Sequence, residues 1–473
     1  MDKKVISALL MASMLAGLFA CGESTQPDET TAQSGETTTE AETTSYIDTL
    51  PKVDYTGQEF VIIGQNKNDR QNFYIEELES EVRNDALKKR DTAVSERLGI
   101  ILEYVSYPAR GEVTAAVQQA VLAGDESYHL MVNSLSDGMN KLTSGDMLYD
   151  LKEIPYLTLD SERWNASMLE NMSFNNKLFF TTGPVSLTYY YTPISMMMNL
   201  RLADEYKVGN IYDIVKSGKW TADKLYSLTK DVSRDLNNDG TMDENDFYGL
   251  LMEGTFGNVL FNSTGIKSVE NGKLMLDSAN SIDAIQKLAG MFGDRDVFFN
   301  DPGGNDTGVP VFRNGNGLFM DYDMLGISQT RDMKDDFAII PTPKYDESQE
   351  KYNSVCNTWL ASGIGVPKIC SDPERTGLVM ETMAYYSNEY LTPAVYEVTL
   401  KGKVARDDDS SIMLDIIYEN TYFDMVTAFN FNNVAVLLRD AVLGETENFS
   451  SAYAASKSAA QAELDKILES TNS

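Results

Sequence analysis

The chain has 473 residues, 42% of them hydrophobic, so it is long enough for two or three domains with substantial cores. Its 72 acidic and 39 basic side chains give a formal charge of −33. This excess of negative charge argues against nucleic acid and anionic lipid head groups as partners, and it suits neutral or cationic ligands and divalent cations.

The first 20 residues predict a lipoprotein signal peptide. Two lysines precede an apolar run, residues 5–20, that is shorter than the ~20 residues of a membrane-spanning helix. Residues 18–21, LFAC, resemble a bacterial lipobox apart from Phe19, which predicts lipidation of Cys21. An ordinary signal peptide with an incidental cysteine is the alternative.

Residues 21–45 predict a disordered tether between this lipid anchor and a folded body. From Gly22 onward the segment has no lysine, arginine or aromatic residue, so it cannot bury enough apolar surface to offset the entropy cost of ordering. The anchor and the tether together place the protein outside the cytoplasm, on the outer face of the cell membrane.

From residue 46 onward, strand patterns alternate with helix patterns, which predicts layers of parallel α/β structure. The only histidine, His129, lies in the apolar run YHLMV, which predicts a structural role in a buried strand. We expect strands at 60–65, 100–107, 129–134, 177–182, 189–199, 336–344 and 359–368, and helices at 84–99, 112–124, 221–234 and over most of the chain after Pro373.

The stretch DLNNDGTMDEND, residues 235–246, has the spacing of an EF-hand calcium loop. The predicted oxygen ligands are Asp235, Asn237, Asp239, Thr241 through its carbonyl, Asp243 and Asp246. Because the last position is Asp instead of Glu, Mg²⁺ competes better, and a solvated acidic turn is the alternative. The residues that follow predict a strand and no outgoing helix, so we expect a structural Ca²⁺ ion and no calcium switch.

Two cysteines remain beyond Cys21, namely Cys356 and Cys370. Two thiols are too few to define a disulfide framework. We expect both to be free and buried, with a disulfide between them as the alternative.

Five segments in order resemble family 1 extracellular solute-binding proteins, the maltose-binding-protein-like receptors of ABC importers, over nearly all of residues 55–470. The chain departs from the family pattern at His129, where Asp is usual, and at Leu318, where a small residue is usual. The segments are GDESYHLMV, GDMLYDLKEIPYLTLD, GKWTADKLYSLTKDVSRDLNNDGTMDENDFYGL, FRNGNGLFMDYD and DDFAIIPTPK.

This resemblance implies a monomeric receptor with two α/β lobes, a periplasmic-binding-protein-like fold, joined by a hinge that closes on a ligand. A membrane permease then recognises the closed form, and no bond is broken. By position, we expect crossings between the lobes near 187–191, 355–360 and 405–410, lobe 1 at 46–188 and 360–406, and lobe 2, with the calcium loop, at 189–359 and 407–473.

The resemblance also implies a carbohydrate site in the cleft, which needs aromatic platforms and polar partners for hydroxyl groups. We expect Tyr322 and Trp359 to stack on the sugar and Asp321 to accept hydrogen bonds from it; the alternative is that the aromatic residues belong to the core. The full predicted set is Gln65, Asn66, Asn133, Ser134, Ser136, Tyr189, Tyr190, Glu253, Phe256, Asp321, Tyr322, Asp323, Asn357, Trp359, Phe429 and Phe431.

Two other functions stay open at this point. A secreted glycan hydrolase would use Asp321 and Asp323 as a carboxylate pair, although such pairs usually come from different strands. A surface adhesin would bind glycans without a hinge. For the receptor, an oligosaccharide is the expected ligand, with a peptide or a polyol as alternatives.

Overall fold

The computed structural model describes residues 45–65, 73–75, 81–300, 307–330, 332–405, 407–446 and 448–471. Cys21, the signal peptide, nearly all of the tether and Asn66 lie outside the described residues, so the expectations about them stay predictions. The chain divides into two compact units, Met1–Ser45 and Tyr46–Ser473, and every element below belongs to the second. Within the described ranges, no helix is long and apolar enough to span a membrane.

The first of two five-stranded sheets has the order β2-β1-β3-β13-β4. Strands β1, β2 and β3 are parallel, and β13 runs antiparallel to β3 and β4. Ile62 and Ile63 of β1 are almost fully buried, as expected for a strand covered on both faces. The strands are β1 (Glu59–Gln65), β2 (Ile101–Tyr107), β3 (Leu130–Ser134), β4 (Phe180–Thr181) and β13 (Ser362–Gly365).

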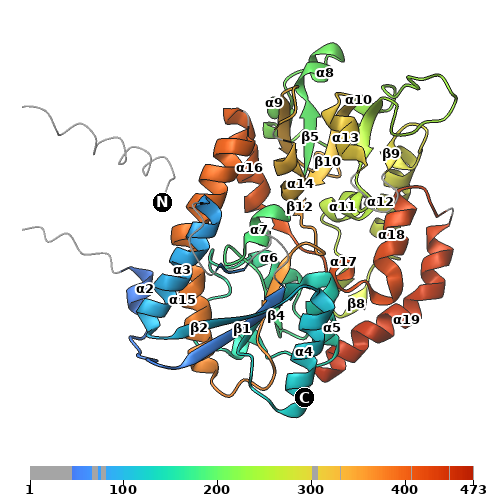
Figure 1. The fold of residues 1–473 in the computed structure, drawn as a ribbon. Helices are drawn as coiled ribbons and strands as arrows, with labels where there is room; N and C mark the ends of the chain where they lie inside the picture. Colours follow the sequence, from blue (N-terminus) through green and yellow to red (C-terminus); the bar gives the residue numbers. More distant parts are fainter. Residues whose placement is uncertain are drawn as a thin grey trace, which may run out of the picture. The chain divides into compact units, whose positions relative to one another are not determined.

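Three long helices accompany this sheet, α3 (Val82–Leu98), α4 (Arg110–Ala123) and α15 (Pro373–Leu391). Helices α3 and α4 end, as predicted, at glycines in the left-handed conformation, with φ of 69° at Gly99 and 65° at Gly124. Helix α15 packs along α3 although the two lie far apart in the sequence (Figure 1). The first lobe is therefore assembled from both early and late parts of the chain.

His129 has the structural role that the sequence predicts. Its Nδ1 accepts a hydrogen bond from the backbone N–H of Val61 at 2.9 Å, and its ring stacks on Phe60 with the centroids 5.1 Å apart. Burial lowers the pKa of His129, so the neutral ring that this hydrogen bond requires is favoured.

The second sheet has the order β11-β5-β10-β6-β9. Strand β5 is antiparallel to both of its neighbours, whereas β10, β6 and β9 are parallel to one another. The run Met196 to Met198 on β5 is at most 1% exposed and belongs to the core. The strands are β5 (Ile194–Asn199), β6 (Tyr248–Met252), β9 (Phe299–Asn300), β10 (Gly317–Asp323) and β11 (Phe337–Pro341).

Helices from several parts of the chain cover the second sheet and make it the centre of the second lobe. Helix α16 packs on β11, and α13 and α14 pack on β10. The helices are α8 (Leu200–Glu205), α9 (Ile211–Lys216), α10 (Ala222–Thr229), α12 (Ala279–Phe292), α13 (Gly308–Arg313), α14 (Met324–Gln329) and α16 (Asp408–Glu419).

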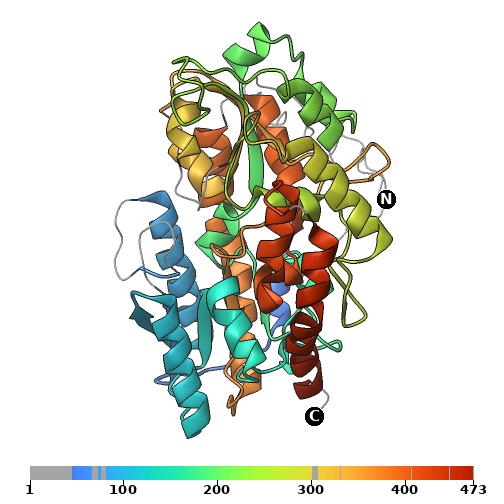
Figure 2. The same cartoon turned by 90° about the vertical axis from the view of Figure 1, so that its right-hand side faces the viewer.

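A small parallel pair, β12 (Ser354–Val355) with β14 (Thr421–Tyr422), lies where the chain passes between the sheets. From β12 the chain runs through residues 356–361 into β13 of the first sheet. Helices α18 and α19 pack against each other and run side by side in both views (Figure 2). Helix α18 also packs on α11, and the three helices are α11 (Phe256–Ser263), α18 (Val434–Val442) and α19 (Phe449–Ser470).

The remaining elements are short or irregular. They are α2 (Tyr46–Thr49), α5 (Asn140–Ser144), α6 (Ala166–Asn171), α7 (Leu187–Tyr191), α17 (Met425–Phe429), β7 (Val269–Glu270), β8 (Lys273–Leu274), the 3-10 turns η2 (Leu151–Glu153) and η4 (Phe431–Asn433), and the π-helical segments η1 (Leu135–Met139) and η3 (Thr392–Val404).

Two predicted elements differ from the structure. The segment 189–199 is one predicted strand, but α7 occupies its beginning, because Ser186 caps that helix and Pro193 separates it from β5. The predicted helix 221–234 starts at its Thr221 cap but ends at Thr229. There Gly249 of β6 lies so close that a Cβ atom on it would be 2.3 Å from the Thr229 carbonyl oxygen, so the strand occupies the space the next turn needs.

Candidate ligand-binding site

A cavity of about 330 Å³ lies at the segment that connects β12 to β13. Its floor is formed by residues 355–359 of that connection. Ser136 of η1 contributes from the first lobe, α11 and α18 contribute from the second, and α17, which packs on both η1 and α18, contributes between them. The cavity thus has walls from both lobes and from a segment that joins them, which is the position expected for the cleft of a hinged receptor.

Trp359 is the aromatic platform of this cavity. Its side chain is 57% exposed, which is unusual for tryptophan in this chain, since Trp164 and Trp220 are nearly fully buried. The backbone N–H of Trp359 donates to Asn357 Oδ1 at 3.1 Å, and its carbonyl accepts from Ser134 Oγ at 2.9 Å. The exposed ring is therefore carried by a backbone that is fixed on both sides.

Two further predicted residues line the cavity next to Trp359. Ser136 donates its hydroxyl hydrogen to Thr358 Oγ1 at 2.7 Å, which ties η1 to the connecting segment. Asn357 donates from Nδ2 to Asp323 Oδ2 at 3.0 Å. Asp323 in turn caps α14 by accepting the backbone N–H of Gly326 at 2.9 Å. Asp323 therefore positions Asn357 and does not itself line the cavity.

The opposite wall contains polar residues that the sequence reasoning missed, notably Asn258, Thr427, Asn430 and Arg439. Asn258 is 8% exposed, and its Oδ1 atom has no hydrogen-bond partner within the described residues. An unpaired buried acceptor costs free energy, so a donor from a ligand hydroxyl would be stabilising there. The signal in the sequence is an asparagine inside FGNVLFNS, a helix whose residues are all buried.

Most of the predicted aromatic platforms lie in the core. Phe429 stacks on Phe431 with the ring centroids 5.3 Å apart, and the ring of Tyr322 fills the space above Gly326, where a Cβ atom would lie 1.2 Å from it. None of these rings lines the cavity. The buried rings and their exposures are Tyr190 at 2%, Phe256 at 0%, Tyr322 at 9%, Phe429 at 8% and Phe431 at 2%.

Asp321 is also placed in the core. It is 0% exposed and accepts the backbone N–H of Glu253 on Oδ1 at 2.8 Å. Burial, together with the nearby carboxylate of Glu253, raises the pKa of Asp321 well above its usual range. Neither Asp321 nor Asp323 lines the cavity, so the pair that a hydrolase would need does not form there.

The other predicted polar residues make hydrogen bonds within their own lobes, and they do not line the cavity. Asn133 is 2% exposed and donates from Nδ2 to the Arg110 carbonyl and to Thr114 Oγ1, each at 3.1 Å. Gln65, at the end of β1, accepts from Arg110 Nε at 3.2 Å. Glu253 accepts the N–H of Thr255 in a tight turn at 2.9 Å.

Tyr189, the last of the predicted ligand-binding residues, and the two cysteines, which are predicted only as free thiols, remain to be placed. Tyr189 packs edge-on against Tyr190 with the centroids 5.4 Å apart and does not line the cavity. Cys356 and Cys370 are both free thiols, as predicted, but Cys370 is only half-buried. Cys356 lies in the cavity wall, where burial raises the pKa of its thiol to about 12 and keeps it protonated at neutral pH.

The acidic loop 235–246 is held by its own backbone amides. Asp235 accepts the N–H groups of Asn238 and Gly240, and Asp246 accepts those of Leu236 and Asp243. Among the described residues, no three Asp, Glu, His or Cys side chains converge as they would around a metal ion. The following residues form β6, as predicted, and no outgoing helix. Metal binding by this loop stays a prediction from the spacing.

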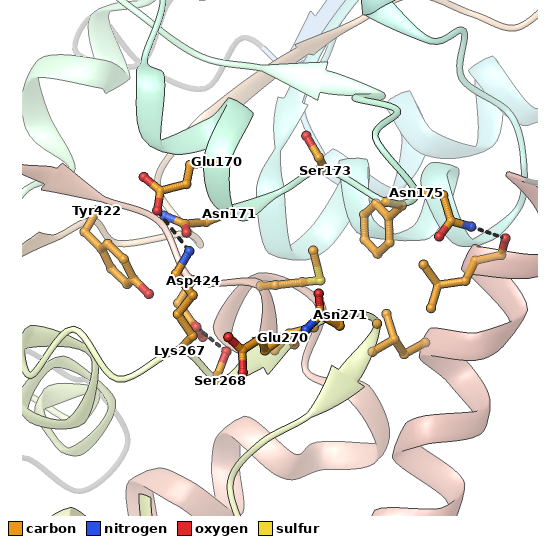
Figure 3. A pocket seen from close by; sticks show the side chains of 16 residues that line it. Glu170, Asn171, Ser173, Asn175, Lys267, Ser268, Glu270, Asn271, Tyr422 and Asp424 are labelled. Atoms are coloured by element: carbon orange, nitrogen blue, oxygen red, sulfur yellow. Dashed lines mark hydrogen bonds and ion pairs between the residues drawn. The ribbon is translucent and has the colours of Figure 1, made fainter. Parts of the chain in front are cut away.

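A second cavity, of about 440 Å³, lies between α6, the β7–β8 hairpin, β14 and α19. Its charged side chains are mostly engaged with one another. Lys267 pairs with Glu170 at 2.9 Å, and Ser268 donates to the buried Asp424 (Figure 3). None of the residues predicted to bind ligand lines this cavity, so the smaller one at Trp359 is the better candidate.

No protein-family model matches the sequence, and no curated protein does. Solved structures are similar. A cyclo/maltodextrin-binding protein complexed with maltotetraose has a TM-score of 0.54 at 13% identity over 87% of this chain and 97% of that one. UspC of M. tuberculosis has a TM-score of 0.54 at 13% identity, over 85% of this chain and 100% of that one. MalE from Listeria monocytogenes in complex with maltose has a TM-score of 0.51 at 11% identity, over 88% of this chain and 98% of that one. At these identities the likeness establishes the fold, which is the predicted two-lobed α/β fold.

Proposed function

We propose that this chain, which has the fold of maltose-binding-protein-like substrate-binding proteins, is an extracytoplasmic receptor of an ABC importer. It captures a carbohydrate in the cavity at Trp359 and delivers it to a membrane permease as a monomer. It performs no catalysis; the hinge closes on the ligand and the permease recognises the closed form.

The observation that carries this proposal is the exposed Trp359 on a cavity wall that otherwise offers amides and hydroxyls. A pyranose ring has an apolar face that stacks on an indole, and its hydroxyl groups need hydrogen-bond partners once water is excluded. Ser136, Asn258 and Asn357 supply such partners from three different elements. Two of the similar solved structures are described as complexes with maltose or maltotetraose, which supports a carbohydrate ligand here.

The test is calorimetric titration of the purified chain with a panel of neutral and acidic oligosaccharides, with chromatography of the sugars after incubation. A receptor is expected to bind at least one sugar with one-to-one stoichiometry and to return it unchanged. Cleaved sugar would favour the hydrolase. Binding that leaves the distance between two spin labels, one on each lobe, unchanged would favour a rigid adhesin.

We propose further that Cys21 is lipidated and anchors the receptor. Replacing Cys21 by serine is expected to move the protein from the membrane fraction to the soluble fraction, because serine has no thiol to which a lipid can be attached. Labelled palmitate should enter the wild type and not the variant. Absence of label from the wild type would contradict the proposal.

The loop 235–246 is proposed to bind a structural Ca²⁺ ion, on the basis of its ligand spacing alone. Calcium at a hundred times its Kd would stabilise the fold by about 2.7 kcal/mol, so a chelator should lower the Tm measurably. Asp235→Ala and Asp239→Ala should remove this dependence, whereas Asp231→Ala, at an exposed acid just before the loop, should keep it. A melting curve that chelator leaves unchanged would count against the site, and Mg²⁺ in place of Ca²⁺ tests the choice of ion.

A further inference from the structure

The cavity at Trp359 differs in charge from the rest of the protein. The chain carries 72 acidic and 39 basic side chains, yet the described residues that line this cavity include neither aspartate nor glutamate. Among the described lining residues, Arg439 alone carries a charged side chain, and it is paired with Asp440 at 2.7 Å. The larger cavity of Figure 3, in contrast, is lined by Glu170, Glu270 and Asp424.

A second arginine lies at the edge of this cavity, against its platform. The guanidinium carbon of Arg110 is 5.2 Å from the centre of the Trp359 ring. Arg110 Nε donates to the neutral side chain of Gln65, and within the described residues the guanidinium pairs with no carboxylate. The acid whose charge acts on it, Asp137, pairs with Lys141 at 2.5 Å.

A partly buried guanidinium that no carboxylate contacts among the described residues is costly for the folded protein, and a bound anion offsets that cost. Burial lowers the pKa of Arg110, which is the direction expected when water is removed from a cation without a matching carboxylate. A planar guanidinium presents two parallel N–H donors that fit the two oxygens of an oxyanion, and these charge-assisted bonds are stronger than neutral ones. The missing partner thus has the chemistry of an oxyanion.

Hydroxyl recognition in the cavity supports the same assignment. Sugar sites gain strength when carboxylates accept hydroxyl hydrogen bonds, because such bonds are charge-assisted. This cavity has no carboxylate among its described lining residues and therefore lacks that source of affinity for a neutral sugar. A ligand that brings its own negative charge would recover a charge-assisted bond through Arg110 instead.

We propose that the captured solute is an acidic oligosaccharide. A pyranose ring stacks on Trp359, and an oxyanion on that sugar, either a uronate carboxylate or a sulfate ester, accepts hydrogen bonds from Arg110. This inference rests on the proposed receptor function and specifies the substrate class for the same cavity. The acidic surface repels such a solute at long range, so recognition depends on the short-range contacts at Arg110 and Trp359.

The decisive comparison uses a trigalacturonate and its methyl ester, which have the same sugar rings but charged and neutral carboxyl groups respectively, in calorimetric titration with the wild-type chain. The acid is expected to bind at least tenfold more tightly than the ester, since a charge-assisted hydrogen bond contributes more than a neutral one. A sulfated trisaccharide and maltotriose complete the panel. Whichever of the uronate and the sulfate ester binds more tightly identifies the oxyanion.

Variants test whether Arg110 is the group that recognises the negative charge of the ligand. Arg110→Gln should make the acid and its ester bind equally, and Arg110→Lys should keep part of the preference because it keeps the charge but not the planar donors. Arg313→Gln is the matched control, because Arg313 pairs with Asp332 on an exposed surface of the second lobe. Thermal melting of each variant checks that it is folded.

Outcomes for the two proposals are distinguishable. Equal binding of the acid and the ester by the wild type, or an unchanged preference in folded Arg110→Gln, would contradict the proposal of an acidic ligand. Binding of a neutral sugar in that case would still support the receptor function. Failure of every sugar in the panel, neutral or acidic, would overturn the carbohydrate receptor itself.

Discussion

Replacing Glu381 by alanine is expected to lower the free energy of unfolding by about 3–5 kcal/mol, the range typical of removing one partner from a buried ion pair. Glu381 lies in α15 and is 0% exposed. Its Oε1 accepts from Arg163 Nε at 2.7 Å, and its Oε2 accepts from Trp164 Nε1 at 3.0 Å. Without the carboxylate, an arginine and an indole N–H would be left unpaired in the interior.

The same carboxylate also holds the beginning of the folded body. Tyr46 donates its hydroxyl hydrogen to Oε1 at 2.9 Å, and Thr158 donates its backbone N–H to Oε2 at 3.2 Å. The guanidinium of Arg163 covers the Tyr46 ring at 3.6 Å. Loss of Glu381 should therefore loosen α2 and the 158–164 segment together, beyond the loss of one ion pair.

Denaturant unfolding monitored by circular dichroism measures this effect. The free energy of unfolding of Glu381→Gln should lie between those of the wild type and the alanine variant. Glutamine keeps the size and one acceptor of the side chain, but it places an NH₂ group opposite the same donors. Glu389→Ala is the matched control, an exposed glutamate on the same helix that should change stability by less than about 0.5 kcal/mol. Equal stability of Glu381→Ala and Glu389→Ala would show that the network contributes nothing.

Two aromatic residues of the predicted site should respond in opposite ways to truncation. Tyr322→Ala is expected to cost about 3–5 kcal/mol of unfolding free energy, because the ring is 9% exposed and packs directly on Gly326. Trp359→Ala should cost less than about 1 kcal/mol, because the indole is 57% exposed. For ligand affinity, we expect Trp359→Ala to weaken binding about tenfold to a hundredfold.

Calorimetric titration with the best sugar of the panel and denaturant unfolding of both variants separate stability from affinity. Trp359→Phe serves as the control for Trp359, since a smaller aromatic ring should keep part of the stacking. Full affinity of Trp359→Ala would show that the cavity at Trp359 is not the binding site. Unchanged stability of Tyr322→Ala would show that its ring is not a core residue.

Much of the fold is readable from the sequence because the signals are local. The strands β1 and β3 follow from short apolar runs, and β2 follows from alternation of apolar and polar residues. The ends of α3 and α4 follow from glycines, because a residue without Cβ easily adopts positive φ. The extent of α10 is not readable in this way. The residue that stops it, Gly249, lies twenty positions beyond its last residue, so periodicity within the helix carries no information about it.

The site is only partly readable for the same reason. Ser136, Asn357 and Trp359 follow or precede strand patterns and line the cavity, but Tyr322 also follows a strand pattern and is buried. The residues that flank Tyr322 in the sequence do not distinguish its environment from that of Trp359. The difference arises because α14 turns back over Tyr322 with a glycine at the contact, whereas the Trp359 ring contacts the Arg110 side chain of α4 and stays 57% exposed.

By itself, the sequence determined the alternation of strands and helices, the caps and the residue types from which a sugar site can be built, because these depend on neighbours within a few positions. Only the tertiary structure decided which of those residues face the cavity. Burial depends on contacts between distant segments. Glu381 accepts a hydrogen bond from Arg163, which is 218 positions away, and Arg110 of α4 lies over the ring of Trp359 in the segment between β12 and β13. Contacts between such distant residues produce no periodic pattern in the sequence. The lack of acidic side chains among the described cavity residues also cannot be predicted from the sequence, because folding brings those residues together from separate segments.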